Sequence, residues 1–105
     1  MNTADQHEPP PAGDLIGRLT ARCRDRFGAA LPEVPSIGMI TDQVRVAEAH
    51  AMGRRRQFLA RAVAELDAAL WVHPDGAECR NRLADAIEAL DRADRERPEP
   101  AAGPR

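Results

Sequence analysis

The side chains best suited to metal binding or nucleophilic chemistry are three histidines and two cysteines: His7, His50, His73, Cys23 and Cys79. Structural zinc sites use ligand pairs only a few residues apart, and the sequence holds no Cys-x-x-Cys and no His-x-x-x-His pair. His73 and Cys79 are close in sequence, on either side of an expected turn, but two ligands do not complete a zinc site. The spacing therefore predicts no metal ion and no other cofactor.

Acyl or phosphoryl transfer would need a nucleophile beside a base, or a glycine-rich loop for phosphates. The only serine, Ser36, lies in a proline-rich segment, and no glycine-rich phosphate loop is present. Carboxylates are numerous, but they alternate with arginines in the pattern of solvated helix faces. We therefore expect no catalytic residue and no enzyme activity.

Charge distribution is a stronger signal than any catalytic group. Residues 18–26 carry four arginines against Asp25, and residues 54–61 carry four arginines and no acid. Residues 62–96 hold nine acidic and four basic side chains, a net charge of −5. Two interpretations follow: the basic segments pair with the acidic segment inside the chain, or they form a patch for an acidic partner or a nucleic acid.

Composition narrows the class of protein. All 15 basic residues are arginine, and together with the many alanines this favours the codon usage of a GC-rich bacterium. A net charge of −2 predicts no general affinity for nucleic acids or anionic membranes. The chain has no long apolar run and no secretory leader pattern, so no membrane partner is expected. Two cysteines on apolar helix stripes predict buried thiols and a cytoplasmic location.

The elements that would position these groups are all helical. Leu15, Leu19, Cys23 and Phe27 recur every four residues, which predicts a helix that starts near Asp14 and ends at Gly28. Proline-rich tails are expected to be disordered at residues 1–13 and 97–105, so that residues 14–96 form the helical domain.

A second apolar stripe starts at Ile37 and Ile40. Either Ser36 or Thr41 can cap this helix, and we favour Thr41. The helical phase continues through Gly53 into Phe58 and Ala62. Because one glycine inside a helix costs only about 1 kcal/mol, a single long helix to about Leu70 is preferred over two shorter ones.

Pro74 ends that helix, since it cannot donate a backbone hydrogen bond to a continuing one. Asp75 and Glu78 then predict a capping box for a third helix. Its apolar stripe is expected to face the core, and its exposed side to carry acid–base pairs four residues apart. These pairs are Glu78–Arg82, Glu88–Arg92 and Asp91–Arg95.

The single tryptophan, Trp71, lies off the main apolar stripe, on the side of Ala60 and Ala64. Two interpretations are open. Another helix of the chain covers Trp71, or Trp71 anchors an interface with a partner, where tryptophan is enriched.

The run ARAVAELDAALWVHPDGAECRNRLADAIEAL, within about residues 58–90, resembles the junction between two tetratricopeptide repeats. Ala69 and Leu70 precede Pro74 as an Ala-Leu pair precedes the helix-ending proline of that family. Ala62, Leu83 and Ala84 match further positions, whereas Gln57 stands where the family has a turn glycine and Arg80 where it often has an aromatic residue. The resemblance implies peptide or protein binding without catalysis.

The sequence thus predicts an all-α protein, either a small three-helix bundle or a helical hairpin with a packed short N-terminal helix. We expect a non-enzymatic interaction module that binds another protein or itself. Its predicted contact residues are Trp71, Ala60 and Ala64, with Arg54, Arg55 and Arg56 steering acidic partners. The alternative is a small nucleic-acid-binding regulator that uses the arginine clusters at 18–26 and 54–61.

Overall fold

A computed structural model describes residues 9–96, which form four α-helices and no strand. The helices are α1 (Ala12–Phe27), α2 (Ile37–Ala49), α3 (Gly53–Ala69) and α4 (Ala77–Arg95). The predicted all-α class is confirmed. Of the predicted tails, residues 1–8 and 97–105 lie outside the described residues.

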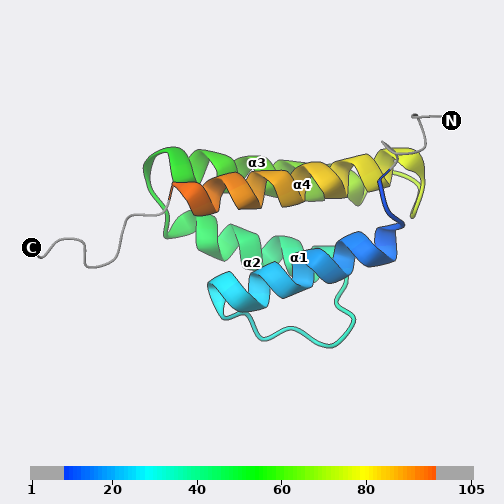
Figure 1. Cartoon of the computed structure of the whole chain (residues 1–105), viewed down its shortest axis with the longest axis horizontal. Helices are drawn as coiled ribbons and strands as arrows, with labels where there is room; N and C mark the ends of the chain where they lie inside the picture. The colour runs from blue at the N-terminus through cyan, green and yellow to red at the C-terminus, as the bar shows by residue number, and fades with distance from the viewer. Residues whose placement is uncertain (1–8, 97–105) are drawn as a thin grey trace, which may run out of the picture.

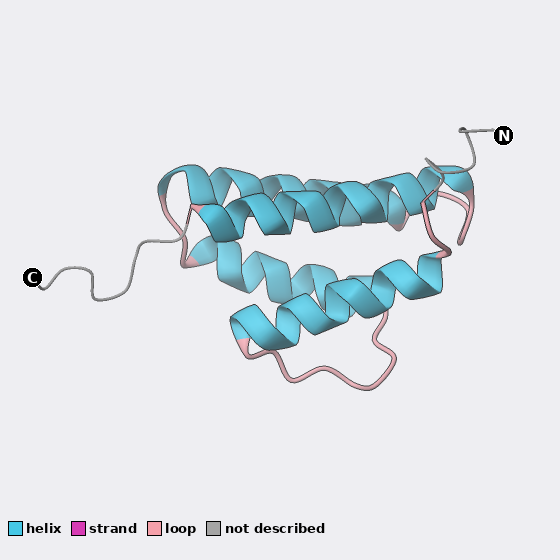
Figure 2. Cartoon of the chain, in the orientation of Figure 1, coloured by secondary structure: helices cyan, strands magenta, loops and turns pink. Residues whose placement is uncertain are grey.

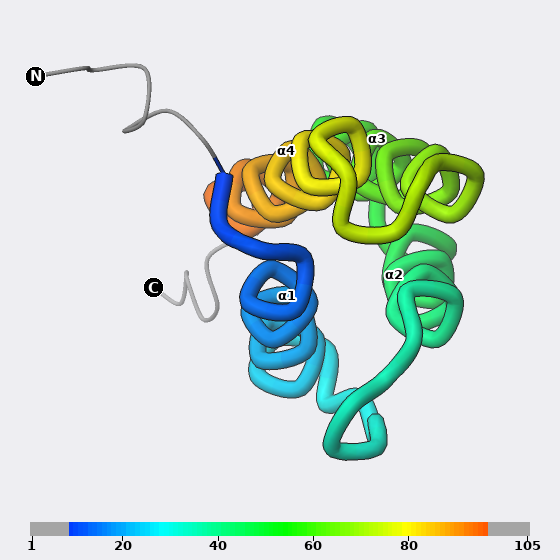
Figure 3. The backbone as a smooth tube through the Cα atoms, turned by 90° about the vertical axis from the view of Figure 1, so that its right-hand side faces the viewer, coloured from blue at the N-terminus to red at the C-terminus, as the bar shows by residue number. Residues whose placement is uncertain are grey.

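The four helices form a bundle in which each helix packs against two neighbours (Figures 1 and 3). The α3–α4 pair packs most extensively, and α2 covers the other side of α3. Helix α1 closes the arrangement by packing against α4 and α2, whereas the backbones of the diagonal pairs are not in close contact. Helix α3 runs opposite to the other three, so the link between α1 and α2 is a long crossover, the lower loop in Figure 2.

The core is built from the predicted apolar stripes. All four helices contribute side chains that are almost completely removed from solvent, namely Leu15, Leu19, Cys23, Ile40, Val44, Leu59, Leu66, Cys79, Leu83 and Leu90. Burial of a side chain of this size contributes about 1.5–3 kcal/mol relative to leaving it exposed. The three- and four-residue spacing therefore identified the core correctly.

The single long helix preferred from the sequence is wrong, because the chain reverses direction at residues 50–52. Helix α2 ends at Ala49, Met52 is extended, and Gly53 has a left-handed φ of 62°. Glycine adopts this conformation without a steric penalty. Because the chain folds back, the apolar stripes of α2 and α3 face the same core. A continuous helical phase in the sequence is therefore compatible with one long helix and also with two helices that pack against each other.

Two helix starts also differ from the expected ones. Helix α1 begins at Ala12, two residues before Asp14, although its end at Gly28 has the predicted left-handed φ of 64°. Helix α2 begins at Ile37, where Ser36 Oγ accepts a hydrogen bond from the Met39 amide (3.1 Å). The cap is thus Ser36 and not Thr41, whose hydroxyl lies inside the helix and donates to the Ile37 carbonyl (2.8 Å).

The turn before α4 does not form the predicted capping box. Gly76 is the N-cap of α4 and provides no side-chain cap. Asp75 has a left-handed φ of 59°, and its Oδ1 accepts a hydrogen bond from the Ala12 amide at the start of α1 (2.7 Å). A carboxylate at this point also offsets the positive end of the α1 dipole. Asp75 therefore caps a different helix from the one that follows it.

Candidate interaction surfaces

Trp71 follows α3 directly and is almost fully in solvent. Its side chain is 85% exposed, and the preceding Leu70 is 47% exposed. The Trp71 amide donates to the Ala68 carbonyl (3.2 Å), so the backbone here continues the last turn of the helix. The interpretation in which another helix covers Trp71 is wrong for the described residues.

The exposed side of α3 forms a strip that ends at Trp71. At 100° per residue its members lie within about 80° of each other, with Arg56 at the edge of the strip about 20° from the buried Val63. We call this strip the α3 outer face: Arg56, Ala60, Ala64 and Trp71. Ala64 is exposed and Ala60 half-buried, so small side chains leave the middle of the strip flat. Trp71 and Ala64, two residues of the predicted contact face, are thus exposed.

The first arginine cluster is engaged within the fold. Arg22 and Arg26 each contact Asp91 of α4 at 3.0 Å, and Arg24 donates to the Leu31 and Pro32 carbonyls (2.9 and 2.7 Å). For α1, the predicted pairing with the acidic segment is confirmed. Glu78–Arg82 and Glu88–Arg92 also form as predicted.

Asp91 does not pair with Arg95, contrary to the prediction, because its carboxylate binds the guanidinium groups of Arg22 and Arg26 on α1. Partial burial works to raise the pKa of Asp91, but the hydrogen bonds and charges of Arg22 and Arg26 outweigh it. The pKa of this carboxyl is therefore lowered from its ordinary value. Asp91 is thus the main electrostatic link between α1 and α4, beside a longer Arg26–Asp94 contact at 3.9 Å.

The second arginine cluster has no such partners. Within residues 9–96, Arg54, Arg55, Arg56 and Arg61 form no ion pair, and the first turn of α3 contains no acidic residue. The N-terminus of α3 also lacks a side-chain cap. Three arginines and the positive end of the helix dipole thus lie together, which attracts anionic groups.

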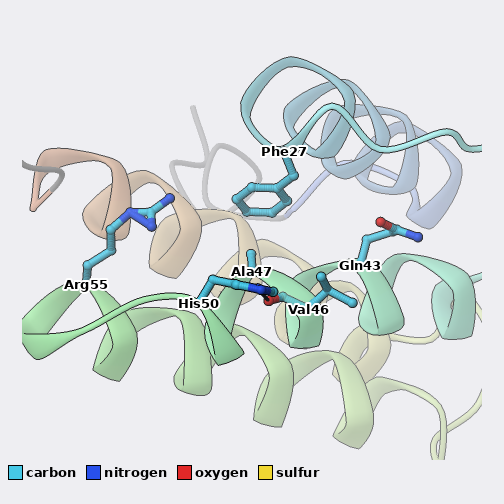
Figure 4. Close-up of a pocket in the computed structure, with 6 residues that line it drawn as sticks. All are labelled: Phe27, Gln43, Val46, Ala47, His50 and Arg55. Atoms are coloured by element: carbon cyan, nitrogen blue, oxygen red, sulfur yellow. Dashed lines mark hydrogen bonds between the residues drawn. The ribbon is translucent and has the colours of Figure 1, made fainter. Parts of the chain in front are cut away.

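A groove that the sequence did not predict lies between α1 and α2 (Figure 4). It contains a hollow of about 260 Å³ lined by Phe27, Gln43, Val46, Ala47, His50 and Arg55. A second hollow of about 220 Å³ continues past His50 and Arg55 to Ala51, Met52 and Glu96. We call the two hollows together the α1–α2 groove. The structure thereby separates Arg55, which lines the groove, from Arg56, which lies on the α3 outer face.

The candidate ligand and nucleophile side chains are dispersed over the molecule. The Nδ1 atoms of His50 and His73 each donate to a nearby carbonyl at 2.9 Å. Cys23 and Cys79 are both buried as predicted, and burial raises the pKa of the Cys23 thiol to about 11. A thiol with that pKa is protonated at neutral pH and is a poor nucleophile. His7 lies outside the described residues.

Across residues 9–96 no group of three or more histidine, cysteine or acidic side chains is placed to hold a metal ion. No helix in the same range is long and apolar enough to cross a membrane. Comparison of the chain with models of protein families, with curated proteins and with solved structures gives no match.

Proposed function

We propose that this chain is a non-enzymatic protein-interaction module that binds another protein, or a second copy of itself, through the α3 outer face. The observation that carries the proposal is the 85% exposure of Trp71. Tryptophan is among the residues that contribute most to binding energy at protein interfaces. Its contact area is large, and its side chain loses little conformational entropy when it is buried by a partner.

The scaffold beneath this face is held from both sides. Arg82 of α4 contacts Glu65 at 3.0 Å, and Arg45 of α2 contacts Asp67 at 2.9 Å. Helix α3 is thus fixed between α4 and α2, and its outer face is formed before a partner arrives. A preformed surface reduces the entropy that association must overcome.

The ends of the face differ in chemistry. Trp71 provides an apolar end, and Arg56 provides a cationic end about 22 Å away at 1.5 Å per residue. A partner that covers the whole face therefore combines apolar side chains with acidic ones at the opposite end. Arg54 and Arg56 raise the encounter rate with such a partner through long-range attraction.

Two further features agree with this proposal. The α3–α4 hairpin is the part of the chain that resembles a tetratricopeptide-repeat junction, a family that binds peptides and proteins. Cys23 and Cys79 are free and buried, which fits a reducing compartment such as the cytoplasm.

The alternative function, nucleic-acid binding through both arginine clusters, has weaker support. Arg22, Arg24 and Arg26 already bind groups of the chain itself, so they are not free to contact phosphates. Only the exposed Arg18 and the cluster at 54–61 are left for that role. A mobility-shift assay at low and moderate salt decides between the functions, since phosphate-driven binding strengthens steeply as salt is lowered.

The proposed function is tested by photo-crosslinking in the native host. A photo-reactive amino acid replaces Ala64 in one variant and Ala21, an exposed alanine on α1, in the control. We expect a discrete adduct from position 64, none from position 21, and loss of the adduct when Trp71→Ala is added. Equal labelling from both positions contradicts the proposal. So does Trp71 emission that is blue-shifted and resistant to acrylamide in a sedimentation-verified monomer.

A further inference from the structure

Helix α2 has a second apolar stripe, distinct from the one it buries in the core. Met39 is 46% exposed and Val46 is 56% exposed. At 100° per residue, Met39, Gln43, Val46 and His50 fall within about 60° of each other. The core-facing residues Ile40 and Val44 point in another direction. An apolar stripe left in solvent on a small helical protein is a candidate interaction surface.

The packing of α1 beside this stripe turns it into one wall of the α1–α2 groove. Phe27 of α1 extends toward Ala47, and Val46 and His50 of α2 line the same hollow (Figure 4). The α1–α2 pair packs least extensively of the four touching pairs, so the groove is not closed by its own walls. From Met39 to His50 the stripe runs for about 16 Å, or three turns of a helix laid along it.

One end of the groove is lined by Arg55 and Glu96, and with Arg54 and Arg56 next to Arg55 in the chain this end carries a net positive charge. The Nε atom of Arg55 is buried and has no hydrogen-bond partner within residues 9–96. Arg54 and Arg56 are adjacent and form no ion pair in the same range, and they share the positive end of the α3 dipole. A carboxylate of a partner placed against the Arg55 guanidinium would form a charge-assisted hydrogen bond.

We propose that the α1–α2 groove binds an acidic amphipathic helix of a partner protein. Apolar side chains of that helix lie against Phe27, Val46 and Ala47, and its carboxylates lie at the end marked by Arg54–Arg56. This is the helix-in-groove mode, in which apolar anchors recur at three- and four-residue steps. The thioethers of Met39 and Met52, the latter 83% exposed, adapt to anchors of different shape.

The chemistry of the groove favours a peptide over a nucleic acid. A nucleic-acid backbone needs cations along its whole length, whereas the cations here lie at one end and the remainder of the hollow is lined by apolar and neutral groups. The groove and the α3 outer face share the arginines at the start of α3, but Val46 lines only the groove and Trp71 lies only on the outer face, so Val46→Asp and Trp71→Ala test the two sites separately.

The experiment uses the full-length chain with ¹³C-labelled methionine methyl groups. Met52 lines the groove and Met39 lies on the same α2 stripe one turn from Gln43, so both report on binding there, and the indole N–H of Trp71, observed with ¹⁵N, reports on the α3 outer face. The probe is a synthetic helix-forming peptide of about 15 residues, with leucine at three- and four-residue steps and glutamate on the remaining face. A matched peptide carries lysine in place of every glutamate, and a short DNA duplex is the third ligand.

We expect the glutamate peptide to shift the Met39 and Met52 signals and to leave Trp71 unchanged. Val46→Asp should weaken this binding about tenfold and Arg55→Glu about fivefold, since each removes one kind of contact. Arg18→Glu, on an exposed arginine of α1, and Trp71→Ala are the matched controls and should change it less than twofold. Circular dichroism confirms that each variant is folded.

A charge swap gives the sharpest result. The variant with Arg54→Glu, Arg55→Glu and Arg56→Glu should lose the glutamate peptide and gain the lysine peptide. The proposal is overturned if neither peptide shifts Met39 and Met52 at millimolar concentration, or if the wild-type chain binds both peptides equally. A DNA duplex that shifts these signals in preference to the peptide would overturn it as well.

Discussion

The α3–α4 hairpin and the α1–α2 pair are built from similar amphipathic helices, but they are packed very differently. Residues 70–76 join α3 to α4, the two helices run antiparallel, and their apolar stripes meet along their length. Helices α1 and α2 run parallel, so residues 28–36 must return the chain before α2 can start. The antiparallel α3–α4 pair buries its apolar stripes against each other. The parallel α1–α2 pair leaves the α1–α2 groove and an exposed apolar stripe on α2. The two connections, residues 70–76 and 28–36, are similar in length, so the relative direction of the paired helices is what distinguishes the two halves of the molecule.

The largest expected effect on the free energy of unfolding is in the α3–α4 hairpin. Leu83→Ala removes a fully buried side chain of α4, and substitutions of this kind cost about 2–5 kcal/mol of unfolding free energy. Urea unfolding monitored by circular dichroism measures it. Val46→Ala, in the α1–α2 pair, is the matched control and should cost less than about 0.5 kcal/mol. Similar losses of unfolding free energy for the two variants would mean that the α3–α4 hairpin and the α1–α2 pair do not differ in packing as described.

Gly53→Ala tests the break between α2 and α3. Gly53 has a φ of 62°, and an added Cβ would meet nothing within 4 Å, so the expected cost is backbone strain alone. Left-handed geometry costs a residue with a Cβ about 1–2 kcal/mol. Urea unfolding should show destabilisation of that order, and Gly17→Ala, on an exposed helical glycine, should not. A stabilised Gly53→Ala protein would indicate one continuous helix in solution.

Asp91→Asn tests the electrostatic link that holds α1 to α4. Because the folded-state pKa of Asp91 is lowered, its contribution is present above the unfolded-state pKa of about 3.9 and is lost as pH falls through the folded value. For a partly exposed pair, about 0.5–1 kcal/mol is expected at pH 7. Unfolding free energies at pH 7 and pH 3 should therefore differ less in the variant than in the wild type. An identical pH dependence in both proteins would count against the link.

The smallest effect on stability is expected at Trp71. Its side chain has few neighbours to lose, so Trp71→Ala should change the unfolding free energy by less than about 0.5 kcal/mol. Thermal unfolding measures the change, with Leu66→Ala as a buried reference. A loss above 2 kcal/mol would show that the tryptophan is structural.

Periodicity predicted the helices and the core because burial depends on which residues share a face. It did not predict the break at Gly53, because apolar residues recur with the same periodicity in two helices that share one core as in one continuous helix. Nor did it predict the new partner of Asp75, because that contact depends on where α1 lies. Trp71 was correctly placed off the core stripe, but its exposure was not decidable until the positions of the other helices were known. The α1–α2 groove was missed for the same reason, although Met39 and Val46 stood off the core stripe.

The hydrogen bond from the Ala12 amide to Asp75 joins residues that are 63 positions apart in the chain. Closing so long a loop costs more entropy than forming the neighbouring hairpins, whose contacts are local in sequence. We therefore expect α2, α3 and α4 to assemble first and α1 to dock last. The same order implies that α1 is released first when the protein opens, which would expose the Cys23 thiol to alkylation before the rest of the core unfolds.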